Sequence, residues 1–117
     1  MMASKIVIGS RQFSLTTGES IDVTLFLPEM NGDDYKCEYK IRGSNLNIDG
    51  YSFGIDSIQS IYLALKNIST DLYASELWSS GNLHWTGGFN PGDLGLPMTD
   101  AIESMVAEAA ANSGSAV

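Results

Sequence analysis

Hydrophobic and polar residues alternate along the first half of the chain, in four segments separated by turn-forming residues. Such alternation predicts β-strands with one buried face and one face in water. The clearest case is 35–42, where Tyr35, Cys37, Tyr39 and Ile41 alternate with charged residues. The other three segments are 11–16, 21–27 and 46–53, the last of which we expect to bend or bulge at Gly50. Because short polar connections join the segments, they predict an antiparallel meander.

The hydrophobic period changes from two to about 3.6 residues after Gly54. This change predicts a helix over 57–74, with Asp56 or Ser57 able to cap its free amides. Its apolar stripe consists of Ile58, Ile61, Tyr62, Leu65, Ile68 and Leu72. The stripe is wide enough to cover one face of a small sheet. The two periods together predict a core of Ile21, Val23, Leu25, Tyr39, Ile41, Ile58, Ile61 and Leu65.

Beyond the first helix, Leu83 and Trp85 suggest a short additional strand, and the Gly- and Pro-rich stretch 86–97 predicts a long ordered loop. A second helix is expected from Asp100, with Asp100 as cap and Glu103 three residues later in a capping-box arrangement. Its apolar side comprises Ala101, Ile102, Met105, Val106 and Ala109. We therefore predict an α+β fold with an antiparallel meander of four to five strands, one main helix and a C-terminal helix.

Length and composition fit one globular domain, which we place at 1–111 with a flexible tail at 112–117. The chain has 117 residues, 44% of them hydrophobic, enough for a core without disulfides. The single Cys37 cannot form an internal disulfide. No stretch is long and apolar enough for a membrane span, and the N-terminus lacks a signal-peptide hydrophobic region. The expected compartment is the cytoplasm; composition leaves the oligomeric state open.

Charge is the most informative compositional feature. Six Lys and Arg residues face 14 Asp and Glu residues, for a net charge of −8. This balance argues against nucleic acid and anionic membranes as partners, since both require clustered cations. All the cations precede residue 67, and the acids after it are Asp71, Glu76, Asp93, Asp100, Glu103 and Glu108. This distribution is typical of a solvated acidic surface, or of a docking face for a basic protein.

Residue types that carry chemistry are few. His84 is the only histidine, and no Gly-x-Ser-x-Gly elbow accompanies it. Cys37 lies on the apolar side of its strand, where burial raises a thiol pKa, so we expect it to pack in the core. The acids lack EF-hand spacing, and the glycines near Gly88 match no phosphate-binding motif. We therefore expect no enzyme activity, no cofactor and no metal.

A partner-binding surface is the remaining candidate site. Asp93, Asp100 and Glu103 flank the irregular loop and begin the last helix, where side chains stay accessible. Phe89 and Leu94 lie beside them and could act as apolar anchors. The alternative for these two residues and for Trp85 is that they fold back over the sheet.

The segment 50–65, Gly-Tyr-Ser-Phe-Gly-Ile-Asp-Ser-Ile-Gln-Ser-Ile-Tyr-Leu-Ala-Leu, resembles a stretch of small uncharacterised bacterial proteins. Their shared pattern is a Gly-Val/Ile-Asp-Ser-Leu/Ile-Gln turn that opens a Leu-Ala-Leu helix. The resemblance extends to 32–37, to Leu83 and Trp85, and to 92–97. It implies a meander followed by one main helix, and no established activity.

Small acidic proteins of this type also resemble immunity proteins of bacterial toxin systems, including contact-dependent inhibition. That likeness rests on size, acidity and the lack of catalytic motifs. It leads us to expect a non-catalytic binding module that neutralises a basic toxin domain, such as a nuclease. The alternatives are a small accessory or scaffold protein and, third, an enzyme that depends on His84.

Overall fold

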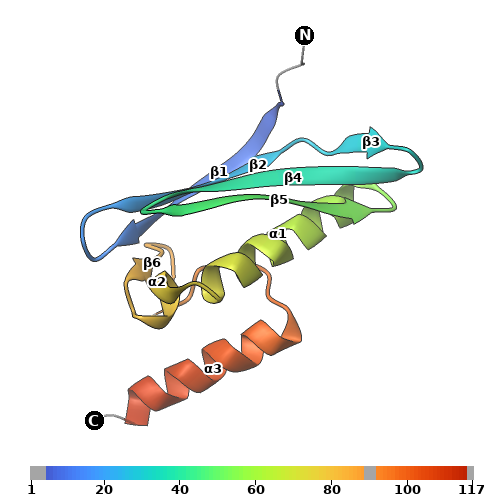
Figure 1. Cartoon of the computed structure of the whole chain (residues 1–117). Helices are drawn as coiled ribbons and strands as arrows, with labels where there is room; N and C mark the ends of the chain where they lie inside the picture. Colours follow the sequence, from blue (N-terminus) through green and yellow to red (C-terminus); the bar gives the residue numbers. More distant parts are fainter. Residues whose placement is uncertain (1–4, 89–91, 116–117) are drawn as a thin grey trace.

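The computed structural model describes residues 5–88 and 92–115, with the side chains of 113–115 left out, and it has the predicted α+β fold. A six-stranded antiparallel sheet packs on one helix, and a second long helix lies beyond it (Figure 1). The elements are β1 (Val7–Leu15), β2 (Ser20–Phe26), β3 (Glu29–Asn31), β4 (Asp34–Gly43), β5 (Leu46–Gly54), α1 (Ser57–Tyr73), α2 (Glu76–Ser79), β6 (Leu83–His84) and α3 (Asp100–Ser115). None of the helices in the described residues is long and apolar enough to cross a membrane.

The predicted meander is confirmed, since β1 pairs with β2, β2 with β4, and β4 with β5, all antiparallel. The short β3 extends the pairing along β4. On its other edge, within residues 5–88 and 92–115, β1 pairs only with the two-residue β6, through Ser14 and Leu15. Strand β1 starts at Val7, before the predicted segment 11–16, because its first residues also pair with β2 across an irregularity between Val7 and Gly9. That irregularity breaks the alternation on which the prediction depended.

Most of the predicted core is confirmed. Ile21, Val23, Tyr39 and Ile41 are buried. Leu25, Ile61 and Leu65 are half-buried and pack against this core. The remaining buried apolar residues include Phe13, Leu15, Cys37, Ala64, Ile68, Leu72, Tyr73, Leu83 and Leu94. The core therefore lies between the inner face of the sheet and α1, as expected.

The prediction for Ile58 is wrong, because its side chain is 78% exposed, and Tyr62 one turn later is also exposed. The reason is the close approach of α1 to the end of β5. A Cβ atom at Gly54 would overlap the backbone nitrogen of Ser60. Helix α1 therefore turns Ser60 and Ala64 toward the sheet, where both are fully buried. Short side chains occupy the face that the hydrophobic stripe assigned to larger ones.

Asp56 is the cap of α1: its Oδ1 accepts a hydrogen bond of 2.7 Å from the Gln59 backbone nitrogen. Gly50, by contrast, introduces no bulge in β5, because the register with β4 is uninterrupted through it. The ring of Tyr39 occupies the space that a side chain at Gly50 would need. Tyr39 then donates a hydrogen bond of 2.6 Å to Asp71 on α1. The glycine thus permits a tyrosine to cross from sheet to helix.

Helix α3 begins with a different cap from the one predicted. The hydroxyl of Thr99, not Asp100, accepts a hydrogen bond of 3.3 Å from the Ile102 nitrogen, so Asp100 lies within the first turn. Ile102 is buried, Met105 and Val106 are half-buried, and Ala101 is exposed. The helix is assigned through Ser115 and so includes the first residues of the predicted tail, 112–115. Residues 116–117 lie outside the described part.

Candidate functional site

The loop that precedes α3 is fastened to the domain at Leu94. The Leu94 nitrogen donates a hydrogen bond of 2.9 Å to the Tyr73 hydroxyl. Nη1 of Arg11 donates to the Leu94 and Gly95 carbonyls, at 2.9 and 3.0 Å. The Leu94 side chain is 0% exposed. It cannot serve as an exposed anchor in this structure, which corrects its assignment to the partner surface and agrees with the alternative that it folds back.

Arg11, like Tyr73 and Trp78, is a residue of this arrangement that sequence patterns missed. Its guanidinium carbon lies 4.1 Å from the centre of the Trp85 ring, a favourable cation–π geometry. The same ring leaves no room for a side chain at Gly95, whose φ is +66°. A signal was present in the sequence, because Arg11 shares the inward register of Phe13 and Leu15, where a charged residue requires partners.

Tyr73 and Trp78 complete the attachment of the loop. Nε1 of Trp78 donates a hydrogen bond of 2.8 Å to the Gly92 carbonyl, and the two aromatic rings meet edge to face at 5.1 Å. Burial raises the pKa of Tyr73, the hydrogen bond from Leu94 opposes that shift, and the charge of Asp93 adds to it. The phenol therefore stays neutral and accepts the Leu94 N–H bond at physiological pH.

The three acids of the predicted surface have different surroundings. Asp93 is half-buried, and its Oδ1 accepts a hydrogen bond of 2.8 Å from the Gly95 nitrogen. Asp100 and Glu103 are both exposed in the first turn of α3, where carboxylates suit the helix dipole. Glu108 is exposed further along the same helix. We call Asp100, Glu103 and Glu108 the acidic helix set. Phe89 lies outside the described residues.

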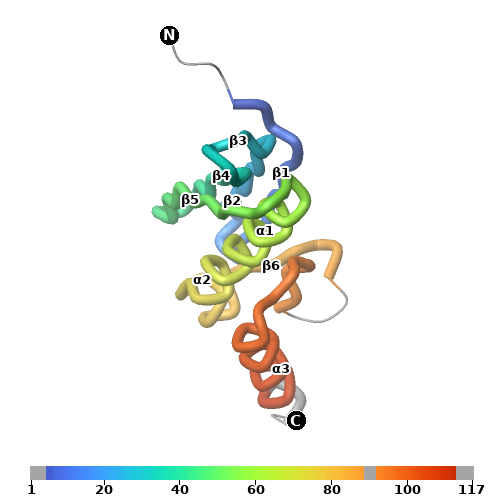
Figure 2. The backbone as a smooth tube through the Cα atoms, turned by 90° about the vertical axis from the view of Figure 1, so that its right-hand side faces the viewer, coloured from blue at the N-terminus to red at the C-terminus, as the bar shows by residue number. Residues whose placement is uncertain are grey.

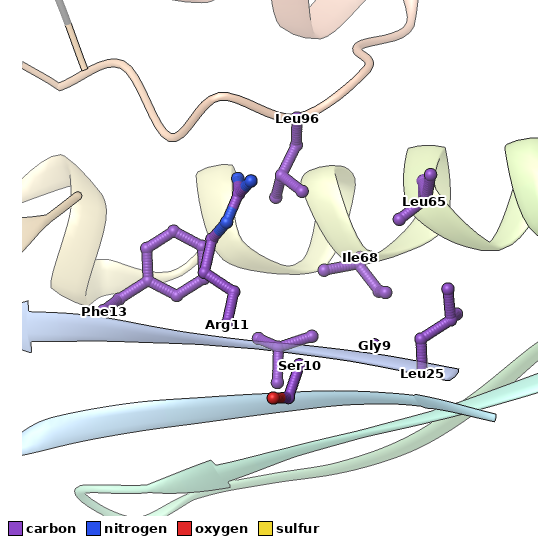
Figure 3. A pocket seen from close by; sticks show the side chains of 9 residues that line it. Gly9, Ser10, Arg11, Phe13, Leu25, Leu65, Ile68 and Leu96 are labelled. Atoms are coloured by element: carbon purple, nitrogen blue, oxygen red, sulfur yellow. The ribbon is translucent and has the colours of Figure 1, made fainter. Parts of the chain in front are cut away.

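An apolar hollow of about 130 Å³ opens between β1, β2 and α1, with the loop along its rim (Figure 3). Its lining includes Gly9, Phe13, Leu25, Leu65, Ile68 and Leu96. Arg11 extends past the hollow toward the loop, while Leu96 points from the loop toward α1 (Figure 3). Sequence patterns could not find this site, because its walls come from four separate segments.

A family model described as a domain of unknown function, DUF6968, matches residues 9–98. The chain belongs to the DUF6968 family. No curated protein and no solved structure matches the chain. The DUF6968 match begins at Gly9, on the hollow, and ends at Met98. The acidic helix set therefore lies beyond the matched region, whereas Arg11, Tyr73, Trp85 and Leu94 lie inside it.

The two candidate reactive side chains of the DUF6968 domain, those of His84 and Cys37, lie in different environments. His84 is exposed on β6, opposite Ser14. Cys37 is fully buried, and its thiol donates to the Phe26 carbonyl at 3.4 Å. Burial, with a smaller contribution from Glu38, raises the pKa of Cys37 to about 11, which disfavours the reactive thiolate. Among residues 5–88 and 92–115, no group of three His, Cys, Asp or Glu side chains could hold a metal ion.

The outer face of the DUF6968 sheet has mixed charge. Because Cys37, Tyr39 and Ile41 face α1, the alternating Lys36, Glu38, Lys40 and Arg42 face away from it. Lys5 pairs with Glu38 at 3.1 Å, and Arg42 pairs with Asp49, which lowers the Asp49 pKa through their hydrogen bond. The Lys36 ammonium lies 4.5 Å from the centre of the Tyr51 ring. Four of the six cations therefore lie on this face.

Proposed function

We propose that this protein is a non-catalytic binding module that neutralises a basic protein by direct contact, as immunity and antitoxin proteins do. The observation that carries this proposal is the acidic helix set. Asp100, Glu103 and Glu108 are exposed on one helix, and neither that helix nor any residue after Lys66 supplies a cation. The negative electrostatic field of these three carboxylates is therefore not offset by any cation in the helix.

The arrangement of the elements places four cations away from α3. Lys5, Lys36, Lys40 and Arg42 lie on the mixed-charge outer face of the sheet, whereas α3 lies on the other side of α1 (Figure 2). A basic partner would be attracted toward α3 more than toward the outer face of the sheet. Complementary potentials of this kind speed encounter and select partners more than they add affinity. Fast interception suits a protein that must block a toxin domain, of which a basic nuclease is the expected example.

A specific observation also supports the second candidate, a small accessory or scaffold protein. Much of the outer edge of β1 is unpaired in the part of the chain that the structure describes, and an open strand edge can bind an extended peptide. The two candidates differ in whether binding abolishes a toxic activity. They also differ in genomic setting, because an immunity protein is expected beside a reading frame for a larger protein with a toxic C-terminal domain.

The decisive experiment is protection of cells that express the toxic domain encoded next to this protein. The native chain should restore growth, and the triple variant Asp93→Asn, Asp100→Asn and Glu103→Gln should protect at least tenfold less well. Asparagine at position 93 can still accept the Gly95 hydrogen bond, so the loop keeps its shape. The matched control neutralises the exposed acids Glu29, Asp33 and Asp34 at the β3–β4 turn, with the same change in net charge. Equal loss of protection in both variants would contradict a role for Asp93, Asp100 and Glu103, and with it the role of the acidic helix set, to which Asp100 and Glu103 belong.

A further inference from the structure

The edge of β1 that faces away from β2 is unpaired over most of its length in the described part of the chain. Thr16 donates its backbone N–H to the Asn82 carbonyl on this edge, and Ser14 pairs there with His84. Main-chain groups of alternate strand residues point the same way, so those of Ser10 and Gln12 also face this edge. In the described residues no strand pairs with β1 there beyond Ser14 and Leu15. Two consecutive pairing positions are therefore open to another strand.

The apolar hollow lies directly beside this open edge, since Gly9, Ser10 and Arg11 of β1 form part of its lining. Gly9 leaves the site open: a Cβ atom built there would meet nothing within 4 Å. An apolar cavity near 150 Å³ can hold a benzene-sized group, so about 130 Å³ accommodates one aliphatic side chain. Val7 and Ile8, at the start of the same strand, are more than two-fifths exposed. The surface thus combines free main-chain groups with apolar side chains, as strand addition requires.

We propose that an extended segment of the partner adds a strand to the open edge of β1 and inserts one aliphatic side chain into the hollow. This inference rests on the proposed function in that the segment belongs to the neutralised partner. Strand addition supplies affinity through main-chain hydrogen bonds and specificity through pockets for alternate side chains. The hollow lies beside the open edge of β1. Strand β1 and strand β5 lie toward opposite edges of the sheet (Figure 2).

Charge identifies the chemistry of the segment. The protein carries a net charge of −8, which favours a basic segment over an acidic one. The one cation in the lining, Arg11, is already engaged with two loop carbonyls and the Trp85 ring. A segment with Lys or Arg beside its aliphatic residue is therefore favoured. An acidic segment would have no unengaged cation in the lining with which to pair.

The test uses a random octapeptide library displayed on phage and selected against the full-length protein. Enriched peptides should place an aliphatic residue beside Lys or Arg, and they should bind the native chain in fluorescence anisotropy after synthesis. Gly9→Leu adds an apolar side chain at the hollow, where its Cβ atom meets nothing within 4 Å, and should weaken binding at least tenfold. The matched control is Asn47→Leu, which adds the same side chain at an exposed position of β5 and should leave binding unchanged.

Hydrogen exchange supplies a measurement that needs no variant. The Ser10 and Gln12 amides should exchange rapidly in the free protein and become protected when an enriched peptide is bound. Absence of enrichment, equal binding by Gly9→Leu, or unchanged exchange at both amides would overturn the proposal. A concentration-dependent dimer of the native chain that Gly9→Leu abolishes would overturn it too, because a second copy would then occupy the edge. If Gly9→Leu protects cells fully while the acidic triple variant does not, this inference fails and the proposed function stands.

Discussion

Arg11 donates a hydrogen bond of 2.9 Å to the carbonyl of Leu94, although 83 residues separate the two along the chain. The bond joins the first strand to the loop before the last helix. A second bond to Gly95 and the contact with the Trp85 ring act on the same guanidinium. One side chain therefore holds the loop in the position that buries Leu94 and leaves Leu96 on the rim of the hollow.

Replacing this side chain should loosen the loop. Arg11→Met keeps an apolar stem but removes both hydrogen bonds, and we expect the free energy of unfolding in urea to fall by about 1.5 to 3 kcal/mol. Lys40→Met removes an exposed cation from the outer face and should cost less than about 1 kcal/mol. Backbone amides of 94–96 should exchange faster in Arg11→Met alone. Equal stability of the two variants would show that the loop is held by other contacts.

Two isoleucines on α1 provide a direct check of how this helix is rotated. Ile68 is 1% exposed, so Ile68→Ala should lower the free energy of unfolding by about 2 to 5 kcal/mol. Ile58→Ala should change it by no more than about 0.5 kcal/mol, because that side chain lies mostly in water. The loss of unfolding free energy caused by Leu65→Ala should lie between these two values, since Leu65 is half-buried beside the hollow. A reversed order of the two isoleucine variants would contradict the orientation of α1.

Alkaline pH should destabilise the fold through Cys37. Its folded pKa is raised to about 11 from a reference of 9.0, so the unfolded state loses the thiol proton first. The stabilisation is complete below pH 9 and is lost as the pH rises from 9 through 11. Cys37→Val removes this titration and should flatten the fall in melting temperature over that interval. The pKa of Tyr39 is also raised, by burial and by its hydrogen bond to Asp71. Tyr39→Phe removes this second titration and is therefore compared with Cys37→Val in the same melting-temperature measurement.

Association with a basic partner should depend on salt. Raising the ionic strength from low values to several hundred millimolar should lower the on-rate by about tenfold or more, with a smaller effect on dissociation. The variant with Asp93, Asp100 and Glu103 neutralised should show a slower on-rate at low salt and a weaker salt dependence. Stopped-flow measurements with the toxic domain test both points. A salt-independent on-rate for the native chain would mean that its acidity serves solubility.

His84 should be dispensable. It is exposed on β6, and no hydrogen bond to its imidazole is found among the described residues. His84→Gln should keep partner binding and protection within about twofold of the native chain, with an unchanged circular dichroism spectrum. Loss of protection in a folded His84→Gln protein would favour the enzyme alternative or an interface centred on this residue.

Periodicity predicted the strands and α1 because both depend on local alternation of apolar and polar residues. It failed where distant segments decide the outcome. The exposure of Ile58 depends on the fit between Gly54 and Ser60. The unbroken register of β5 at Gly50 accommodates the Tyr39 ring. Short residues leave no hydrophobic signal, so a pattern of large side chains cannot find a helix face built from serine and alanine.

The candidate site was predicted less completely than the fold. The exposed acids Asp100 and Glu103 follow from their place in the first turn of a helix. Leu94 was misassigned to the surface because a loop rich in turn formers usually exposes its side chains, and only the long-range bonds from Tyr73 and Arg11 bury it. The hollow required the positions of β1, α1 and the loop relative to one another, which no single segment encodes.

The bond between Arg11 and Leu94 also sets an order of events during synthesis. The meander emerges from the ribosome first, whereas the loop that covers part of β1 emerges after α1 and β6. Until then the part of the inner sheet face that the loop covers stays exposed, an apolar surface of the kind that promotes wrong contacts with neighbouring chains. Slow translation of the segment before Leu94 prolongs this exposure and should therefore raise the aggregated fraction of newly made protein.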